Sequence, residues 1–166
     1  MLKLMYITNV PEIASIADRA GVDRIFIDLE QYGKEKRQKN WDSVKSKHSI
    51  SDIPKVKASV KNAQIFVRTD PVFDGFADEL ESVLACRPDV VMLPYFKTVR
   101  EVETFIKAVD GRARTSILLE TREAAELIDD IISVGGIDEI HIGLNDLSHS
   151  YGKKFLFEEL ADGTVD

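Results

Sequence analysis

Five charged residues stand at points in this sequence where strands are predicted to end: Asp28, Glu30, Arg68, Glu120 and Asp146. Carboxylates in such places can bind a divalent metal ion or move protons, and an arginine can stabilise negative charge on a substrate oxygen. An acidic residue after a strand can equally be the N-cap of the next helix. Glu120 is the sharpest candidate for a functional role. Glu is a mediocre cap, and a buried lone carboxylate is costly unless it is paired or bound to a metal.

Six short apolar runs are the strands that would position these residues. They are LMYIT in the region 2–8, RIFIDLE at 24–30, QIFVRT at 64–69, VVMLPY at 90–95, TSILLE at 115–120 and EIHIGLN at 139–145. Continuous apolar runs, rather than strict alternation, predict strands that are covered on both faces, as in a parallel sheet.

Helical patterns lie between the apolar runs, over 11–21, 51–62, 76–86, 98–111 and 123–136. The first has Ile13, Ile16, Ala17 and Ala20 at helical spacing, which predicts that these residues form its apolar face. The fourth opens with Thr98 and Glu101, which form the pattern of a capping box. The fifth ends at Gly135, a typical C-terminal signal.

Strand and helix therefore alternate along the chain, and the last three strand ends are separated by 25 or 26 residues. This rhythm predicts a parallel α/β fold, either a βα barrel or a doubly wound sheet. No linker divides the chain, so we expect one domain over 1–166. In such folds the carboxyl ends of the strands form one rim, which carries the active site. The five charged residues are therefore expected to converge in space.

The composition excludes several classes of protein. With 166 residues, 44% hydrophobic composition and a net charge of -7, the chain can bury a core and is a poor general nucleic-acid binder. It contains no apolar run of about 18 residues, so we expect no membrane span. No signal-peptide pattern is present, and Cys86 is the only cysteine, which fits a reducing cytoplasm.

The segment between the second and third strands is basic, in contrast to the acidic chain as a whole. Its cations are Lys34, Lys36, Arg37, Lys39, Lys45, Lys47, Lys55 and Lys57. It could be a lid that attracts a phosphate, a carboxylate or a coenzyme A tail, or it could be a solvated loop. Trp41 within it suggests that part of the segment packs against other protein.

Five stretches occur together in the order typical of a known family. They are AGVDRIFIDLE, FVRTDP, DVVMLPYFKTVREVE, ILLETREAAELI and GIDEIHIGLNDLSHSYG. With these motifs, which cover most of the chain, the sequence resembles the HpcH/HpaI aldolase and citrate lyase β family, within the pyruvate/phosphoenolpyruvate superfamily of TIM barrels. The resemblance implies a divalent metal, Mg²⁺ or Mn²⁺, held by Glu120 and Asp146. It also implies that Arg68 contacts the keto or enolate oxygen of a 2-oxo acid, and that a carbon–carbon bond is made or broken beside that carbonyl.

On this resemblance the chain is a metal-dependent aldolase or lyase, expected to form a homo-oligomer. The residues expected to bind the substrate are Arg68, Asp28, Glu30, Gln31, Pro94, Tyr95, Asn145 and Ser148. The strand ends contain no lysine suited to a Schiff base, since Lys97 lies in a following loop, and this disfavours a covalent aldolase mechanism.

The sequence departs from the family at Gln31, where the aldolases usually have an acid–base histidine. Gln cannot transfer a proton. Either the base lies elsewhere, with His48 the candidate catalytic residue because it follows the same strand, or the reaction differs. The alternatives are a citrate-lyase-like acyl-CoA ester lyase and a non-catalytic binding or assembly relative. We expect His141 to be packed, while His149 could contact substrate.

The chain is also shorter than a complete barrel of this type, which has eight strands and about 250 residues. We therefore expect a TIM-type barrel that is incomplete, with about six of the eight β/α units and a truncated C-terminus. Such a barrel would expose two apolar strand edges.

Overall fold

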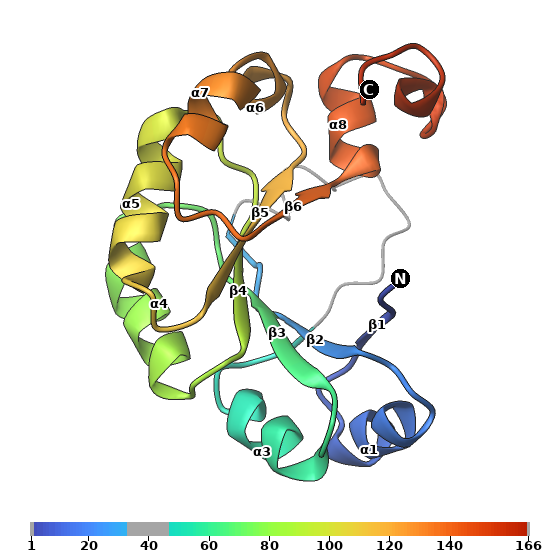
Figure 1. The fold of residues 1–166 in the computed structure, drawn as a ribbon, viewed down its shortest axis with the longest axis vertical. Helices are drawn as coiled ribbons and strands as arrows, with labels where there is room; N and C mark the ends of the chain where they lie inside the picture. The colour runs from blue at the N-terminus through green and yellow to red at the C-terminus, as the bar shows by residue number, and fades with distance from the viewer. Residues whose placement is uncertain (1, 33–46, 166) are drawn as a thin grey trace.

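Six parallel strands form one sheet that curls into a half-barrel, in the order β1-β2-β3-β4-β5-β6 (Figure 1). The computed structural model describes residues 2–32 and 47–165. The strands are β1 (Met5–Ile7), β2 (Arg24–Asp28), β3 (Gln64–Arg68), β4 (Val90–Leu93), β5 (Arg114–Leu119) and β6 (Glu139–Ile142). The expectation of an incomplete α/β barrel of the TIM type is confirmed.

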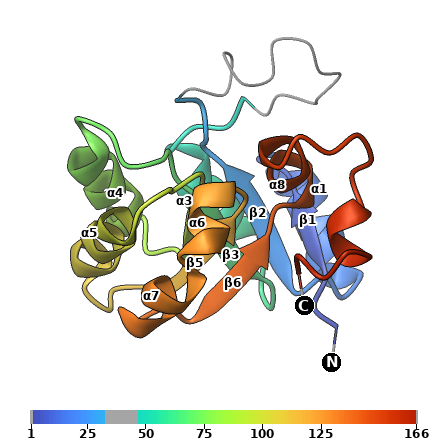
Figure 2. The ribbon, with the colours of Figure 1, turned by 90° about the horizontal axis from the view of Figure 1, so that it is seen from above.

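The helices lie outside the curled sheet, with α4 and α5 side by side on one flank and α1 and α8 on the other (Figures 1 and 2). Their bounds are α1 (Pro11–Arg19), α3 (Asp52–Ser59), α4 (Phe76–Ala85), α5 (Val99–Val109), α6 (Arg122–Glu126), α7 (Ile128–Ser133) and α8 (Leu144–Ser150), and a 3₁₀ turn η1 (Glu158–Leu160) follows. Thr98 and Glu101 form the expected capping box at the start of α5.

Alternate residues of the strands serve two separate apolar clusters. Residues such as Ile27, Val67 and Val91 pack against the helices in the larger cluster. Phe66, with Val90, Met92 and Leu118, forms a smaller cluster in the lumen of the half-barrel. Both faces of the central strands are therefore buried, which explains why their sequences are continuously apolar.

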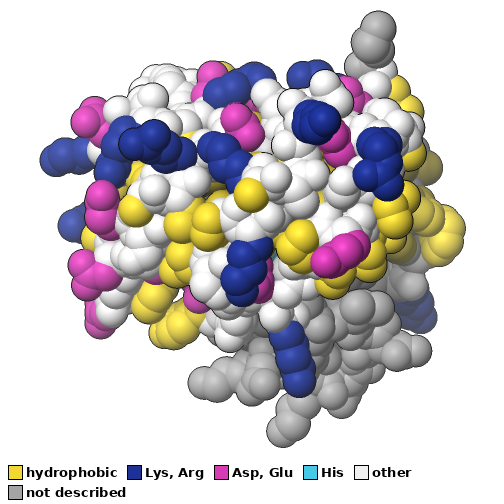
Figure 3. Space-filling model, turned by 90° about the horizontal axis from the view of Figure 1, so that it is seen from below, with side chains coloured by type: hydrophobic (Ala, Val, Ile, Leu, Met, Phe, Trp, Pro, Cys, Tyr) yellow, Lys and Arg dark blue, Asp and Glu magenta, His cyan; other side chains and the backbone are white. Residues whose placement is uncertain are grey.

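The edges of the sheet are exposed, as expected for a barrel that does not close. Met5, Tyr6 and Ile7 of β1 are 37–49% exposed, and Ile140 and Ile142 of β6 are also exposed. Figure 3 shows apolar side chains gathered on the side of the lower face where Figure 1 places α1 and β1. The prediction that every strand is covered on both faces is thus wrong for the two edge strands, β1 and β6.

The predicted inward face of the first helix is right for Ala17 and wrong for the two isoleucines. Ile13 and Ile16 are 40% and 59% exposed, and the buried residues of α1 are Ala14, Ala17 and Asp18. The Asp18 carboxylate accepts hydrogen bonds from three consecutive backbone N–H groups, those of residues 61–63, at 2.7–3.0 Å. These bonds turn the Asp18 face of α1 inward and the isoleucines outward.

Two element boundaries differ from the prediction. The helix expected over 123–136 is divided into α6 and α7 at Leu127, whose N–H donates to the carbonyl of Ala124, only three residues back. The strand expected over 139–145 ends at Ile142, and Asp146 lies in the first turn of α8. A carboxylate in the first turn of a helix is favoured by the helix dipole, so Asp146 marks a helix start and not a strand end. Among the described residues, no helix is long and apolar enough to cross a membrane.

Candidate functional site

Arg68, the last residue of β3, is held by two carboxylates from the end of β2. Its Nε and a terminal nitrogen each lie 2.8 Å from one oxygen of Asp28, in a two-pronged ion pair. Its other terminal nitrogen lies 3.2 Å from Glu30. Register explains the contact, because Asp28 and Arg68 are direct neighbours on adjacent parallel strands. Burial disfavours the charge on Arg68, but the two carboxylates outweigh it and raise the pKa of the guanidinium.

Glu120, directly after β5, is a buried carboxylate with an unfavourable electrostatic environment. It is 5% exposed, and its Oε1 accepts a hydrogen bond of 2.9 Å from the backbone N–H of Tyr95. Burial raises the pKa of Glu120 to about 8, and the negative charges of Glu30 and Asp146 add to this effect. Arg68 opposes it. This corner of the rim therefore carries more negative charge than Arg68 balances.

The backbone around Glu120 is shaped to receive its side chain. Tyr95 adopts a positive φ of 47°, which is uncommon for a non-glycine residue and occurs where the N–H donates to Glu120. On the other side, a Cβ at Gly143 would lie 2.8 Å from the Cβ of Glu120 and 2.9 Å from its Oε2. Only glycine fits there. Sequence reasoning did not single out Gly143, although a glycine between a strand and a helix is a signal of close approach.

The other residues expected in the site differ in burial, and not all of them face the rim. Pro94 is buried beside Tyr95, and Asp146 is half-buried and near enough to raise the pKa of Glu120. Asn145 is exposed. Ser148 is buried, and its hydroxyl donates to the carbonyl of Phe155 at 3.2 Å, so it faces the C-terminal segment.

His48 is buried at the rim, and its geometry favours a holding role over a basic one. It is 9% exposed, and its Nδ1 accepts a hydrogen bond of 3.0 Å from the backbone N–H of Asp28. A neutral ring in this contact carries its proton on Nε2 and so presents a donor at that nitrogen. The side-chain amide of Gln31 lies 3.5 Å from the His48 carbonyl.

The remaining histidines lie apart from these contacts. His141 is packed against Phe66 in the lumen, with ring centroids 5.4 Å apart, as expected. His149 is exposed near the end of α8. Most of the basic segment lies outside the described residues, namely Lys34, Lys36, Arg37, Lys39 and Lys45, and Trp41 does too.

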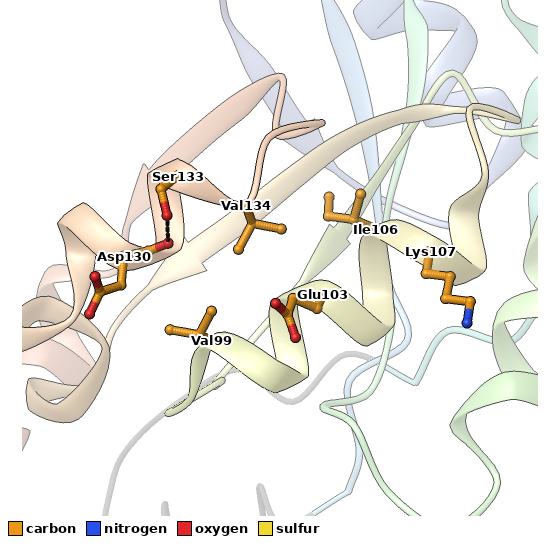
Figure 4. Close-up of a pocket in the computed structure, with 7 residues that line it drawn as sticks. All are labelled: Val99, Glu103, Ile106, Lys107, Asp130, Ser133 and Val134. Carbon is orange, nitrogen blue, oxygen red and sulfur yellow. Dashed lines mark hydrogen bonds between the residues drawn. The ribbon is translucent and has the colours of Figure 1, made fainter.

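A groove of about 750 Å³ lies on the outer surface between α5 and α7 (Figure 4). Val99, Ile106 and Val134 line it together with polar side chains that include Glu103 and Asp130. None of the rim residues described above lines this groove, so it is no part of the candidate site.

The donor set of the rim fits a hard divalent cation. Glu120 and Asp146 offer carboxylate oxygens, the ligands that Mg²⁺ prefers, and a cation would offset the charge that raises the pKa of Glu120. Within the described ranges, no three His, Cys, Asp or Glu side chains are grouped so as to hold a metal ion. Two carboxylates with water and substrate in the other positions is an ordinary arrangement for Mg²⁺.

Comparisons with solved structures confirm the fold. An HpcH/HpaI aldolase/citrate lyase family protein from Burkholderia cenocepacia matches with a TM-score of 0.76 and 12% identity, over 98% of this chain and 72% of that one. The citrate synthase SbnG matches with a TM-score of 0.75 and 19% identity, over 98% of this chain and 69% of that one. The citrate lyase β subunit of M. tuberculosis, complexed with oxaloacetate and magnesium, matches with a TM-score of 0.57 and 21% identity, over 92% and 61%.

The chain thus spans roughly 60 to 70% of the length of these structures. No curated protein sequence gives a significant match. The model of the HpcH/HpaI aldolase/citrate lyase family matches residues 3–159, which is nearly the whole chain. The resemblance carried by the strand-end motifs is therefore confirmed, and this chain belongs to the HpcH/HpaI aldolase/citrate lyase family.

Proposed function

We propose that this chain carries the metal and enolate site of a carbon–carbon lyase or aldolase that acts on a 2-oxo acid such as pyruvate. The family supports a lyase or aldolase, and solved relatives were crystallised with magnesium and small oxo acids. The observation that carries the finer proposal is the buried Glu120 carboxylate. Its pKa is raised to about 8 beside Glu30 and Asp146, and among the described residues Arg68 is the one cationic side chain that opposes this rise.

Glu120 and Asp146 would hold Mg²⁺ or Mn²⁺. The bound metal would supply a Lewis acid for the keto oxygen of the substrate. The Tyr95 N–H keeps Glu120 pointed at the site through the bond to its Oε1, and Gly143 leaves the space that the carboxylate needs.

Arg68 would bind the same substrate oxygen as negative charge develops on it. Its guanidinium has five N–H groups, and the contacts with Asp28 and Glu30 account for three of its nitrogens while leaving N–H directions to spare. The two-pronged pair with Asp28 fixes the plane of the guanidinium before substrate arrives, and such preorganisation is what electrostatic catalysis needs. Asp28 would therefore position Arg68, and Glu30 would orient the substrate or a metal-bound water.

The acid–base step separates the aldolase proposal from a second candidate, a citrate-lyase-like acyl-CoA ester lyase. Gln31 cannot transfer a proton, and the Nδ1 of His48 is occupied by the Asp28 N–H. Both observations favour a reaction whose proton transfers do not depend on a histidine at this rim. A coenzyme A thioester that protects the basic segment 34–57 from proteolysis would support the second candidate.

The test is a titration with Mn²⁺ followed by electron paramagnetic resonance, with and without oxalate, a stable mimic of the pyruvate enolate. Wild type should bind Mn²⁺, and oxalate should change the spectrum of the bound ion. Asp146→Asn should lose affinity on the order of 100-fold, because it removes one of two anionic ligands. Asp129→Asn, an exposed change on α7, is the matched control.

Equal Mn²⁺ affinity in wild type and Asp146→Asn would show that the rim does not bind metal as proposed. Metal binding without any exchange of pyruvate methyl protons would instead support a non-catalytic binding relative. A homo-oligomer and a cytoplasmic location remain predictions from the sequence.

A further inference from the structure

The segment that follows β3 holds the segment that follows β2, immediately beyond Glu30. The Oδ1 of Asp70 accepts two hydrogen bonds from consecutive backbone N–H groups, those of Gln31 at 2.6 Å and Tyr32 at 2.7 Å. The Tyr32 ring also stacks on Phe73, with centroids 4.9 Å apart and planes inclined by 21°. Two independent contacts therefore tie these segments together at the rim.

Asp70 is in turn held from α4. Its backbone N–H donates to the Oε1 of Glu79 at 3.1 Å. The other oxygen of that carboxyl, Oε2, is buried and has no hydrogen-bond partner among the described residues. A buried carboxylate oxygen without a partner is costly when charged, so the Glu79 carboxyl is poised between its neutral and charged forms.

These contacts complete a turn whose two ends are fixed by acidic side chains. At one end Asp28 pairs with Arg68 and accepts the backbone N–H of Glu30 at 3.2 Å. At the other end Asp70 accepts the N–H groups of the two residues after Glu30. The Glu30 carboxylate, which contacts Arg68 and bears on Glu120, projects from the middle of this turn.

We propose that Asp70 is a positioning residue that fixes Glu30 at the rim through the backbone of residues 31 and 32, and that Glu79 controls how firmly Asp70 does so. The functional consequence rests on the proposed enolate site, whereas the anchoring itself does not. Asp70 touches neither metal nor substrate in this arrangement and acts only through Glu30.

The charges give the anchor a pH dependence. Burial raises the pKa of Glu79 to about 7; the hydrogen bond from the Asp70 N–H opposes this rise, and the negative charge of Asp70 adds to it. Asp70 is the one charged group that bears on Glu79 among the described residues. As pH rises through 7, Glu79 gains a charge beside Asp70, and repulsion between the two carboxylates should loosen the turn.

The anchor can be tested by NMR on the isotopically labelled protein, without any assay of activity. Hydrogen exchange at the Gln31 and Tyr32 amides should be slow in wild type and faster, about tenfold or more, in Asp70→Ala. Asp70→Asn keeps an acceptor oxygen and should restore most of the protection.

Between about pH 6 and pH 8, both amide signals should shift in wild type and stay in place in Glu79→Gln. Removing the charge in Asp70→Asn should move the titration of Glu79 to lower pH. Asp78→Asn, an exposed change next to Glu79, is the control.

The functional consequence is read from oxalate affinity in the Mn²⁺-loaded protein. Asp70→Ala should weaken oxalate binding about tenfold, an effect of the size seen for groups that orient a metal site, while Asp70→Asn should weaken it far less. Unchanged amide exchange in Asp70→Ala would overturn the anchor, whatever the metal does. If Asp70→Ala loses amide protection as expected but keeps the oxalate affinity of wild type, the link to Glu30 is overturned. If wild type binds no Mn²⁺, the proposed function fails, and the amide data still decide whether Asp70 is the anchor.

Discussion

The two ends of the half-barrel lumen each contain an arginine paired with a carboxylate, Arg24 buried and Arg68 partly buried, but their charges are balanced differently. At the amino ends of the strands, Arg24 forms a two-pronged pair with Glu139 at 2.5 and 2.6 Å, and Arg114 lies 3.0 Å from the same carboxylate. At the carboxyl ends, Arg68 faces Asp28 and Glu30, with Glu120 and Asp146 nearby.

The consequence is visible in the pKa shifts of the two glutamates. The hydrogen bonds from Arg24 lower the pKa of Glu139, in spite of its partial burial. Burial and two like charges raise the pKa of Glu120 to about 8. Carboxylates of the same chemical type, in the same lumen, are thus stabilised as anions at one end and destabilised at the other. The Arg24–Glu139 pair at the amino ends of the strands is satisfied and stabilises the fold. In the cluster at the carboxyl ends, Arg68 is the one described cation that opposes the raised pKa of Glu120.

The largest effect on stability should come from removing a negative charge at the carboxyl ends of the strands. Glu120→Gln should stabilise the metal-free protein by about 3–4 kcal/mol at pH 8 and by little near pH 5. The raised pKa favours the protonated form of the folded protein. In wild type, the stability that comes from protonated Glu120 is therefore present in full below its ordinary pKa of 4.5, and it is lost as pH rises through 8. Urea unfolding of both proteins in a chelator, at several pH values, measures the difference.

Saturating Mn²⁺ should reverse the order of stability, because binding to the folded state stabilises only the protein that retains the ligand. Glu123→Gln, which changes an exposed carboxylate close by in the chain, is the control. A wild type that is as stable at pH 8 as at pH 5 without metal would show that Glu120 is not strained as described.

The Arg24–Glu139 pair at the amino ends of the strands should give a smaller effect on stability, of opposite sign. Glu139→Gln should destabilise the protein by about 2–3 kcal/mol at pH 7, because Arg24 is 3% exposed and would be left as a buried charge with a weaker partner. The lowered pKa of Glu139 means that its contribution is present above the ordinary value of 4.5 and lost as pH falls below it. Urea midpoints at about pH 7 and pH 4 check both statements.

Glu81→Gln is the matched control for that comparison. Glu81 lies 2.7 Å from Arg112, at an ordinary ion-pair distance, but the two side chains are 64% and 43% exposed. Its loss should cost less than about 0.5 kcal/mol. Equal losses of unfolding free energy in Glu139→Gln and Glu81→Gln would mean that burial does not distinguish the Arg24–Glu139 pair from a surface contact.

The sequence predicts the rim better than it predicts what fixes the rim. Asp28, Glu30, Arg68 and Glu120 are recognisable because each ends an apolar run, and parallel strands bring such ends together. The contacts of Asp70 and Gly143 depend on how close two loops come in space. No pattern along one chain records that distance, although both residues stand beside strand ends.

The wrong predictions share a physical cause, the competition between local pattern and tertiary contact. Helical spacing placed Ile13 inward, but the hydrogen bonds accepted by Asp18 turn α1 the other way. The apolar run before Asp146 looked like one strand, but the chain enters a helix at Leu144. The apolar first strand is exposed because it is an edge of a sheet that the described residues do not close.

The smallest effect should come from an ion pair that lies at the same rim but outside the lumen. Lys97 lies 2.8 Å from Glu123, and the two side chains are 44% and 51% exposed. Lys97→Met should change the free energy of unfolding by less than about 0.5 kcal/mol, because solvent screens the pair. Since the proposed chemistry uses no Schiff base, the change should also leave Mn²⁺ and oxalate affinity as in wild type.

Borohydride reduction with pyruvate should leave wild type without a covalent adduct. An adduct that disappears in Lys97→Met would move the chemistry from the buried carboxylates to this exposed lysine, and the contrast between the two ends of the lumen would then no longer explain the function.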